Sequence, residues 1–416
     1  MRRVVVTGIG AITPIGNDAK TFLENVDAQK IGAGPITKFD ASDLNVSLTG
    51  EVKDFEPTKR LNKKDTKRMD IFCQYGLYSA VEAMTDAGFS EDEPTDKIVA
   101  PERLGVLFGS GIGGITTTTE QAIKMHTKGV DRISPMFIPE VIANMAAGNI
   151  AIRYQAKNMC QCIVTACSSS TDAIGQAFHH IQADRADMMI AGGAEAANMA
   201  MGVGGFAALT AITKADDPTR ASIPFDEDRA GFLLSEGAGT VILEDMGHAL
   251  ARGAKIYGEI VGYGSMCDAY HMTSPDPTGA GAYNAMNEAV READITPAQV
   301  GYINAHGTST KANDAMEAKA IQRLFGADSQ VLVSSTKGMT GHLLGAAGAI
   351  EAIITLKALQ SGQLPINVGV KNQDAACPVT LVSAENQTQT IDYALSNSFG
   401  FGGHDAVLAL KKWRGV

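Results

Sequence analysis

The sequence predicts an α/β protein with a partly parallel sheet, organised as two similar halves. Short apolar runs typical of buried strands alternate with segments whose apolar residues recur every three or four positions. Such alternation favours α/β architecture with parallel strands. The order of elements begins again near Lys255. We therefore expect one half over residues 1–254 and a second over residues 255–416.

Each half is expected to consist of strands followed by helices. In the first half, apolar and β-branched runs predict strands at 3–8, 104–108, 162–166, 188–191 and 239–243, with helices at 20–28, near 120 and directly after 167. In the second half, the same reasoning predicts strands at 256–263, 301–304 and 331–334, helices at 281–293, 314–325 and 343–359, and a closing strand pair at 393–396 and 406–411.

Composition narrows the class of protein. The chain is 45% hydrophobic, which is enough for a large core, and its six cysteines are too few for a disulfide scaffold. The N-terminus lacks a signal-peptide pattern, so we expect a cytoplasmic protein. The segment 188–212 has a single charge but is interrupted by glycines, which favours a buried segment over a membrane span. A net charge of −11 argues against general nucleic-acid binding.

Cys167 is the first candidate catalytic residue. It stands between a predicted buried strand and a helix that opens with small hydroxyl residues. The positive end of a helix dipole should lower the pKa of a thiol at that junction and favour the thiolate. The position therefore indicates a nucleophile.

Two histidines stand in matching glycine-flanked positions. His306 follows the strand at 301–304, and His342 precedes an apolar helix. A single such histidine is more often structural, but two of them beside a helix-capping cysteine favour catalysis. Lys337 lies in the loop of His342 and is either a surface charge or the partner of Glu317, in a buried pair that would hold the loop and supply positive potential.

The glycine-rich segment 397–405 carries Phe401 between glycines. It is either an ordinary hairpin loop or a turn that directs a backbone N–H towards a ligand as an oxyanion-hole donor. The G-x-G-x-x-G pattern at 109–114 lacks the acidic strand end that a dinucleotide site needs. Cys160 and Cys162 lack a second pair at metal-ligand spacing, so we expect no metal site.

A basic segment stands out in this acidic chain. Lysine and arginine recur at three- and four-residue spacing and could share one helix face, either as a solvated surface or as a dock for an acidic partner. The residues are Lys59, Arg60, Lys63, Lys64, Lys67 and Arg68.

Taken together, the motifs resemble those of the elongating β-ketoacyl-acyl-carrier-protein synthases, the type II enzymes of fatty acid synthesis. They are T-A-C-S-S-S, A-H-G-T-S-T, K-G-M-T-G-H-L-L-G-A-A-G and N-S-F-G-F-G-G, in that order, and the likeness runs along nearly the whole chain, including P-F-D-E-D-R-A-G-F. The resemblance implies a thiolase-like fold of two related halves in five αβαβα layers. It also implies a homodimer without a cofactor or membrane, acting on acyl and malonyl groups that acyl-carrier protein presents on a phosphopantetheine arm.

The resemblance also implies roles for individual residues. Cys167 would accept the acyl chain, and His306 and His342 would stabilise the enolate formed as malonyl loses carbon dioxide. Backbone N–H groups of Cys167 and Phe401 would form the oxyanion hole, and Lys337 would act through Glu317. Phe401 would gate an acyl pocket that Ile112 and Phe137 line, and the exposed basic residues Lys63, Lys64, Lys67 and Arg68 would receive the carrier protein.

Two alternatives remain at this point. The serines after Cys167 also resemble polyketide ketosynthases, and a non-catalytic chain-length partner subunit would share the fold, although such subunits lack the cysteine. The sequence departs from the family pattern at Asp172, Ala230, Ser235 and the His404–Asp405 pair. These departures bear on chain-length preference rather than on the reaction.

Overall fold

The protein is built around one large mixed sheet. The computed structural model describes residues 1–90 and 93–415, and in this part of the chain eleven strands form the order β11-β10-β9-β12-β13-β8-β1-β7-β6-β4-β5. The first half contributes β1 (Val4–Ile12), β4 (Leu104–Gly109), β5 (Cys160–Ile163), β6 (Met188–Glu195) and β7 (Gly237–Asp245). The second contributes β8 (Gly258–Cys267), β9 (Val300–Asn304), β10 (Leu332–Ser334), β12 (Tyr393–Gly400) and β13 (His404–Lys411), with the short β11 (Thr380–Leu381) at one edge.

Strand order repeats between the halves. When the short edge strand β11 is set aside, each half has the same order from the outside inward: its third strand, then the second, fourth, fifth and first. The two first strands, β1 and β8, pair antiparallel at the junction. The division at residues 254 and 255 stays an interpretation of the sequence, because the strands of both halves join in a single sheet.

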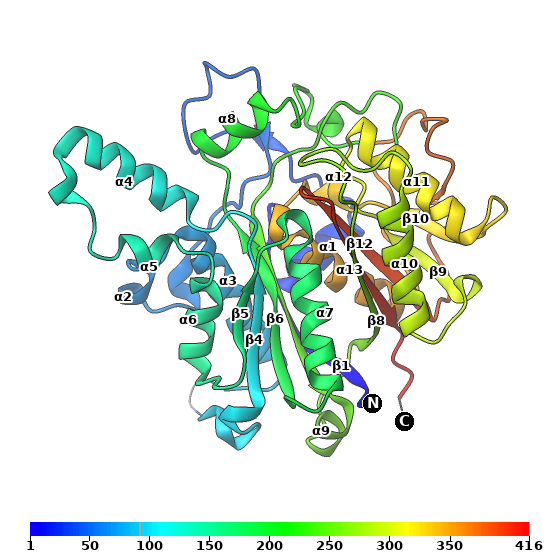
Figure 1. Cartoon of the computed structure of the whole chain (residues 1–416), viewed down its shortest axis with the longest axis horizontal. Coiled ribbons are helices and arrows are strands. Elements are labelled where there is room, and N and C mark those ends of the chain that lie inside the picture. The colour runs from blue at the N-terminus through cyan, green and yellow to red at the C-terminus, as the bar shows by residue number, and fades with distance from the viewer. Residues whose placement is uncertain (91–92, 416) are drawn as a thin grey trace.

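The strands of the two halves count as two layers, and helices between and outside them bring the number of layers to five (Figure 1). Helices α7 (Ser169–Gln182) and α13 (Ala347–Ser361) contact each other and the strands of both halves, so they form the central layer. Helix α13 is buried on nearly all sides, as its almost uninterrupted apolar sequence requires. The outer layers are α3 (Ile71–Asp86) with α6 (Met145–Tyr154), and α10 (Ala280–Glu292) with α11 (Lys311–Phe325).

The remaining elements lie at the periphery. Helices α4 (Ile115–Lys128) and α5 (Phe137–Val141) project from the body in Figure 1. The others are α1 (Ala19–Asp27), α2 (Lys63–Thr66), α8 (Ala200–Ala208), α9 (Met246–Ala251), α12 (Lys337–Thr340), β2 (Gly34–Pro35) and β3 (Leu48–Thr49). Of these, α12 and β3 are buried rather than peripheral. In the described residues, no helix has both the length and the apolar character needed to cross a membrane.

The strand before the nucleophile differs from the prediction. Strand β5 ends at Ile163, and a 3₁₀ turn at Ala166–Ser168 separates it from α7. It is also partly exposed rather than buried, because it pairs only with β4 and forms the open edge of the sheet.

Candidate active site

Cys167 lies in the 3₁₀ turn between β5 and α7. Its neighbour Ala166 has a left-handed backbone with φ of 50°, an unusual conformation for a residue with a Cβ. The Ser169 hydroxyl holds this turn, since it donates to the Ala166 carbonyl at 2.7 Å and accepts from the Thr165 N–H at 3.0 Å. The hydroxyl residues after Cys167 thus fix the conformation that presents the sulfur.

The turn between β12 and β13 covers Cys167 from the second half of the chain. Ser168 Oγ donates to the carbonyls of Ser398 at 2.9 Å and His404 at 2.7 Å. A Cβ at Gly400 would lie 3.1 Å from the Cys167 nitrogen, so this close approach favours glycine. The backbone N–H of Phe401 is close enough to the Cys167 thiol to act against the rise of its pKa, which places one expected oxyanion-hole donor beside the sulfur.

The two histidines meet beside this sulfur. His306 follows β9 and His342 lies between α12 and α13, and their ring centroids are 5.3 Å apart at an interplanar angle of 83°. Phe399 packs edge-on to His306 and Phe232 to His342. Cys167, His306, His342 and Phe401 all line one cavity of about 480 Å³.

Burial sets the protonation states in this cavity. Desolvation, followed by the positive charge of Lys337, holds the pKa of both His306 and His342 well below the ordinary value, so both imidazoles are neutral. Desolvation also raises the pKa of the Cys167 thiol to about 12, although Lys337 and the Phe401 N–H act in the opposite direction. The expectation of a lowered thiol pKa was therefore wrong, because burial outweighs the electrostatic help.

The predicted Lys337–Glu317 pair was also wrong. Lys337 instead forms a buried ion pair with Glu351 of α13. Glu317 accepts the backbone N–H groups of His306 and Gly307, each at 2.8 Å, and the Asn397 side-chain amide at 3.0 Å. Burial raises the pKa of Glu317 to about 6 and that of Glu351 to about 7. Glu317 therefore holds the backbone at His306, while Glu351 is the ion-pair partner of Lys337.

The expected lining residues lie outside this cavity. The Ile112 side chain is 39% exposed, and its N–H donates to Glu195 at 3.2 Å. Phe137 begins the projecting α5. Neither residue lines this cavity, and their assignment to the acyl pocket stays a prediction. Its apolar walls come instead from Phe206, Leu209, Phe232, Leu344 and Phe399.

The basic segment is exposed but does not form one helix face. Helix α2 covers only Lys63–Thr66, and Lys63, Lys64, Lys67 and Arg68 are all exposed. Arg60 turns inward, where its guanidinium lies 4.2 Å from the Tyr78 ring centroid and 3.2 Å from a Glu82 oxygen. Asn62 caps the short helix, and the chain then turns into α3 at Asp70.

Sequence reasoning missed several residues of the site. Glu351 could have been found, because it is a carboxylate within an otherwise apolar helical run. Thr308 and Thr310 line the cavity with hydroxyls 3.0 Å apart. Asp172, noted only as a departure, accepts hydroxyls from Thr165 and Tyr263, each at 2.5 Å, and so braces the residue that precedes the turn of Cys167.

Comparisons with known proteins agree with this architecture. The protein is 47% identical to 3-oxoacyl-[acyl-carrier-protein] synthase 2 of Synechocystis sp. and 45% identical to that of Coxiella burnetii, over 99% of each chain. Solved structures that it resembles include the ishigamide ketosynthase/chain length factor, with a TM-score of 0.92 at 31% identity over 99% of this chain and 100% of that one. Another is a β-ketoacyl synthase of Burkholderia phymatum, with a TM-score of 0.91 at 31% identity over the full length of both chains.

A third similar structure is a type II polyketide acyl-carrier protein in complex with its ketosynthase, with a TM-score of 0.89 at 31% identity over 99% of this chain and 100% of that one. Residues 1–249 match the family model for the β-ketoacyl synthase N-terminal domain, and residues 257–371 match that for the C-terminal domain. With the cysteine and two histidines gathered in one cavity, the chain belongs to the β-ketoacyl synthase family.

Proposed function

We propose that this β-ketoacyl synthase elongates acyl chains by decarboxylative condensation with malonyl-acyl-carrier protein. The observation that carries the proposal is the convergence of one cysteine and two neutral imidazoles on a single cavity. The full-length relatives, named as 3-oxoacyl-[acyl-carrier-protein] synthases, support carrier-bound substrates.

In the first half-reaction the acyl group moves to Cys167. The sulfur attacks the thioester carbonyl of the acyl-carrier protein, and the carrier thiol leaves with the proton that the Cys167 thiol gives up. The high pKa of this thiol makes proton removal part of the step, and the charge of Lys337 favours the developing thiolate. N–H groups of Cys167 and Phe401 stabilise the tetrahedral oxyanion.

In the second half-reaction the malonyl group loses carbon dioxide. The electron pair of the broken carbon–carbon bond forms an enolate, whose oxygen accepts N–H hydrogen bonds from His306 and His342. A neutral imidazole has one N–H donor, so two of them can stabilise this oxygen without protonating it. The enolate carbon then attacks the Cys167 thioester, giving a 3-oxoacyl product two carbons longer and a thiolate that regains a proton.

The proposal includes no resident cofactor, since the phosphopantetheine arm belongs to the substrates. The exposed residues Lys63, Lys64, Lys67 and Arg68 offer positive charge to an acidic carrier protein, within a chain of net charge −11. A related ketosynthase has been solved with its acyl-carrier protein, which supports a carrier protein as partner. Location in the cytoplasm, expected from the sequence, belongs to the same proposal.

A homodimer is the second partnership that we propose. Strand β5 leaves the sheet edge open, and large apolar side chains are exposed around it and on the neighbouring helices: Ile123, Met125, Val130, Ile138, Ile142, Ile152 and Val164. A second copy would cover such an apolar face. Sedimentation equilibrium should give twice the chain mass, and a monomer would contradict the proposal.

Mass spectrometry of the intact protein tests the function directly. Incubation with acyl-carrier substrate should add one acyl group at Cys167, and Cys167→Ala should abolish both this adduct and condensation. Modification at another residue would overturn the assignment. Efficient turnover of straight acyl chains of graded length would separate a fatty acid synthase from a polyketide ketosynthase, and a purified chain unable to condense alone would favour a partner subunit.

A further inference from the structure

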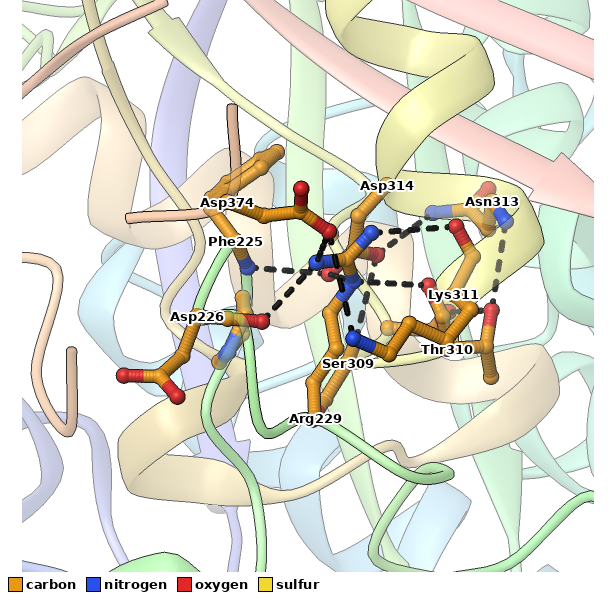
Figure 2. Close-up of polar contacts among 12 residues, drawn as sticks. Phe225, Asp226, Arg229, Ser309, Thr310, Lys311, Asn313, Asp314 and Asp374 are labelled. Carbon is orange, nitrogen blue, oxygen red and sulfur yellow. Dashed lines mark hydrogen bonds and ion pairs between the residues drawn. The ribbon is translucent and has the colours of Figure 1, made fainter. Parts of the chain in front are cut away.

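Arg229 is among the largest fully buried side chains, and no step of the proposed reaction uses it. It stands in the motif P-F-D-E-D-R-A-G-F, and all three of its guanidinium nitrogens are bonded (Figure 2). Nη1 donates to Asp374 Oδ2 at 2.7 Å and to the Asp226 carbonyl at 2.8 Å. Nη2 donates to the Lys311 carbonyl at 3.1 Å, and Nε to the Thr310 carbonyl at 3.2 Å.

Asp314 of α11 connects this guanidinium to the loop that follows β9. Its Oδ2 lies 3.3 Å from Arg229 Nε and accepts the Phe225 N–H at 3.0 Å. Its Oδ1 accepts the Ser309 N–H at 3.2 Å. Arg229 and Asp314, both fully buried, therefore join the segment 225–229 to the loop His306–Thr310.

That loop has a backbone that needs external support. Ser309 has φ of 70° and Gly307 has φ of 37°, both in the left-handed region. A residue with a Cβ adopts this region at a cost of about 1–2 kcal/mol, and it persists where the surroundings fix it. Besides Asp314, the Ser309 hydroxyl accepts the Ile223 N–H at 3.0 Å, and its carbonyl accepts the Gly231 N–H at 3.1 Å.

We propose that Arg229 is a positioning residue for the malonyl half-reaction, acting with Asp314 to set the loop His306–Thr310. This inference rests on the proposed function, because it concerns the same cavity. The loop presents His306 and Thr308 to the cavity, whereas Cys167 is held separately through Ser168 and Ser169. Loss of the contacts of Arg229 and Asp314 should therefore impair decarboxylative condensation much more than acylation of Cys167.

The test compares Arg229→Lys and Arg229→Met with Arg220→Lys and Arg220→Met. Arg220 is a matched control, since this partly buried arginine lies nine residues before Arg229 and bonds to Asp226, Asp228 and the Gly369 carbonyl. Two rates are measured: acylation of Cys167 by mass spectrometry, and single-turnover condensation of pre-acylated enzyme with malonyl-carrier protein. Misplacement of the loop by about 1 Å should lower the condensation rate about 10- to 100-fold in both Arg229 variants.

Acylation should stay within about threefold of the wild-type rate, a change worth less than about 1 kcal/mol. Equal losses in both half-reactions, or unchanged condensation in a less stable protein, would overturn the inference. If Arg229→Met does not fold, Arg229→Lys and Asp314→Asn give the same comparison. An inactive wild-type enzyme would contradict the proposed function itself, whereas an active wild type with unaffected Arg229 variants would contradict only the positioning role.

Discussion

Replacement of Asp405 by asparagine should remove a loss of folding stability that develops as pH rises. Asp405 is 2% exposed on β13, and burial, followed by the facing carboxylate of Asp268, raises its pKa to about 8. Glu317 and Asp276 add further negative charge nearby. Asp405 Oδ2 has no hydrogen-bond donor, so the two carboxyl groups can bond to each other only while they share a proton.

The magnitude follows from proton linkage. Because the folded pKa lies above the unfolded value of about 3.9, the folded state keeps a proton that the unfolded state loses, and stability falls as pH rises towards 8. Each pKa unit corresponds to about 1.4 kcal/mol, so this group alone removes about 3 kcal/mol between pH 5.5 and 8. With an unfolding entropy of about 2.1 cal/mol/K per residue, this loss shifts the Tm of a chain of 416 residues by about 3–4 °C.

Thermal unfolding of the wild type and Asp405→Asn at pH 5.5, 7 and 8.5, at constant ionic strength, measures this effect. The Tm advantage of the variant should grow by about 3–4 °C across the series. Asp217→Asn serves as the control, because hydrogen bonds lower the pKa of Asp217 and it does not titrate in this range. A Tm difference that stays constant with pH would show that Asp405 is ionised throughout, and would refute the reasoning.

Three further outcomes are expected. Denaturant unfolding measures the free energy of unfolding in two double-mutant cycles. The cycle of Lys337→Met with Glu351→Gln should give a coupling energy above about 1 kcal/mol. The cycle of Lys337→Met with Glu317→Gln should give a clearly smaller coupling energy. Because the pKa values of His306 and His342 lie well below 6.5, single-turnover condensation should not lose rate through imidazole protonation between pH 6.5 and 8; a rise with an apparent pKa near 7 would contradict neutral imidazoles. Lys64→Glu with Lys67→Glu should raise the KM for carrier protein several-fold but leave small malonyl thioesters unaffected, with Lys20→Glu as an exposed control; unchanged KM would rule out docking there.

Local sequence patterns predicted most of the fold. Apolar runs located the strands β1, β4, β6 and β7, because a buried strand needs only a short stretch of apolar side chains. Strand β5 was misjudged, since its apolar and β-branched residues look the same whether a second strand covers them or not. Its place at the sheet edge follows from strand order, which local composition does not encode.

The site was predictable where motifs carry the chemistry and less so where tertiary packing decides. Cys167, His306, His342 and Phe401 were recognised from their motifs, and the structure gathers them at one cavity. The partner of Lys337 was missed because Glu351 and Glu317 are both buried helical carboxylates, and only packing distinguishes them. The pKa of Cys167 was misjudged for a similar reason, since the extent of its burial depends on a turn contributed by the other half.

The central helices have a further consequence for how substrates reach the cavity. Helix α7 begins two residues after Cys167 and α13 begins five residues after His342, and these helices pack against each other. A hinge that swung one half away from the other would pull Cys167 from the two imidazoles and break the three residue pairs between β1 and β8. We therefore expect an acyl chain to reach the cavity without opening of the molecule between its halves.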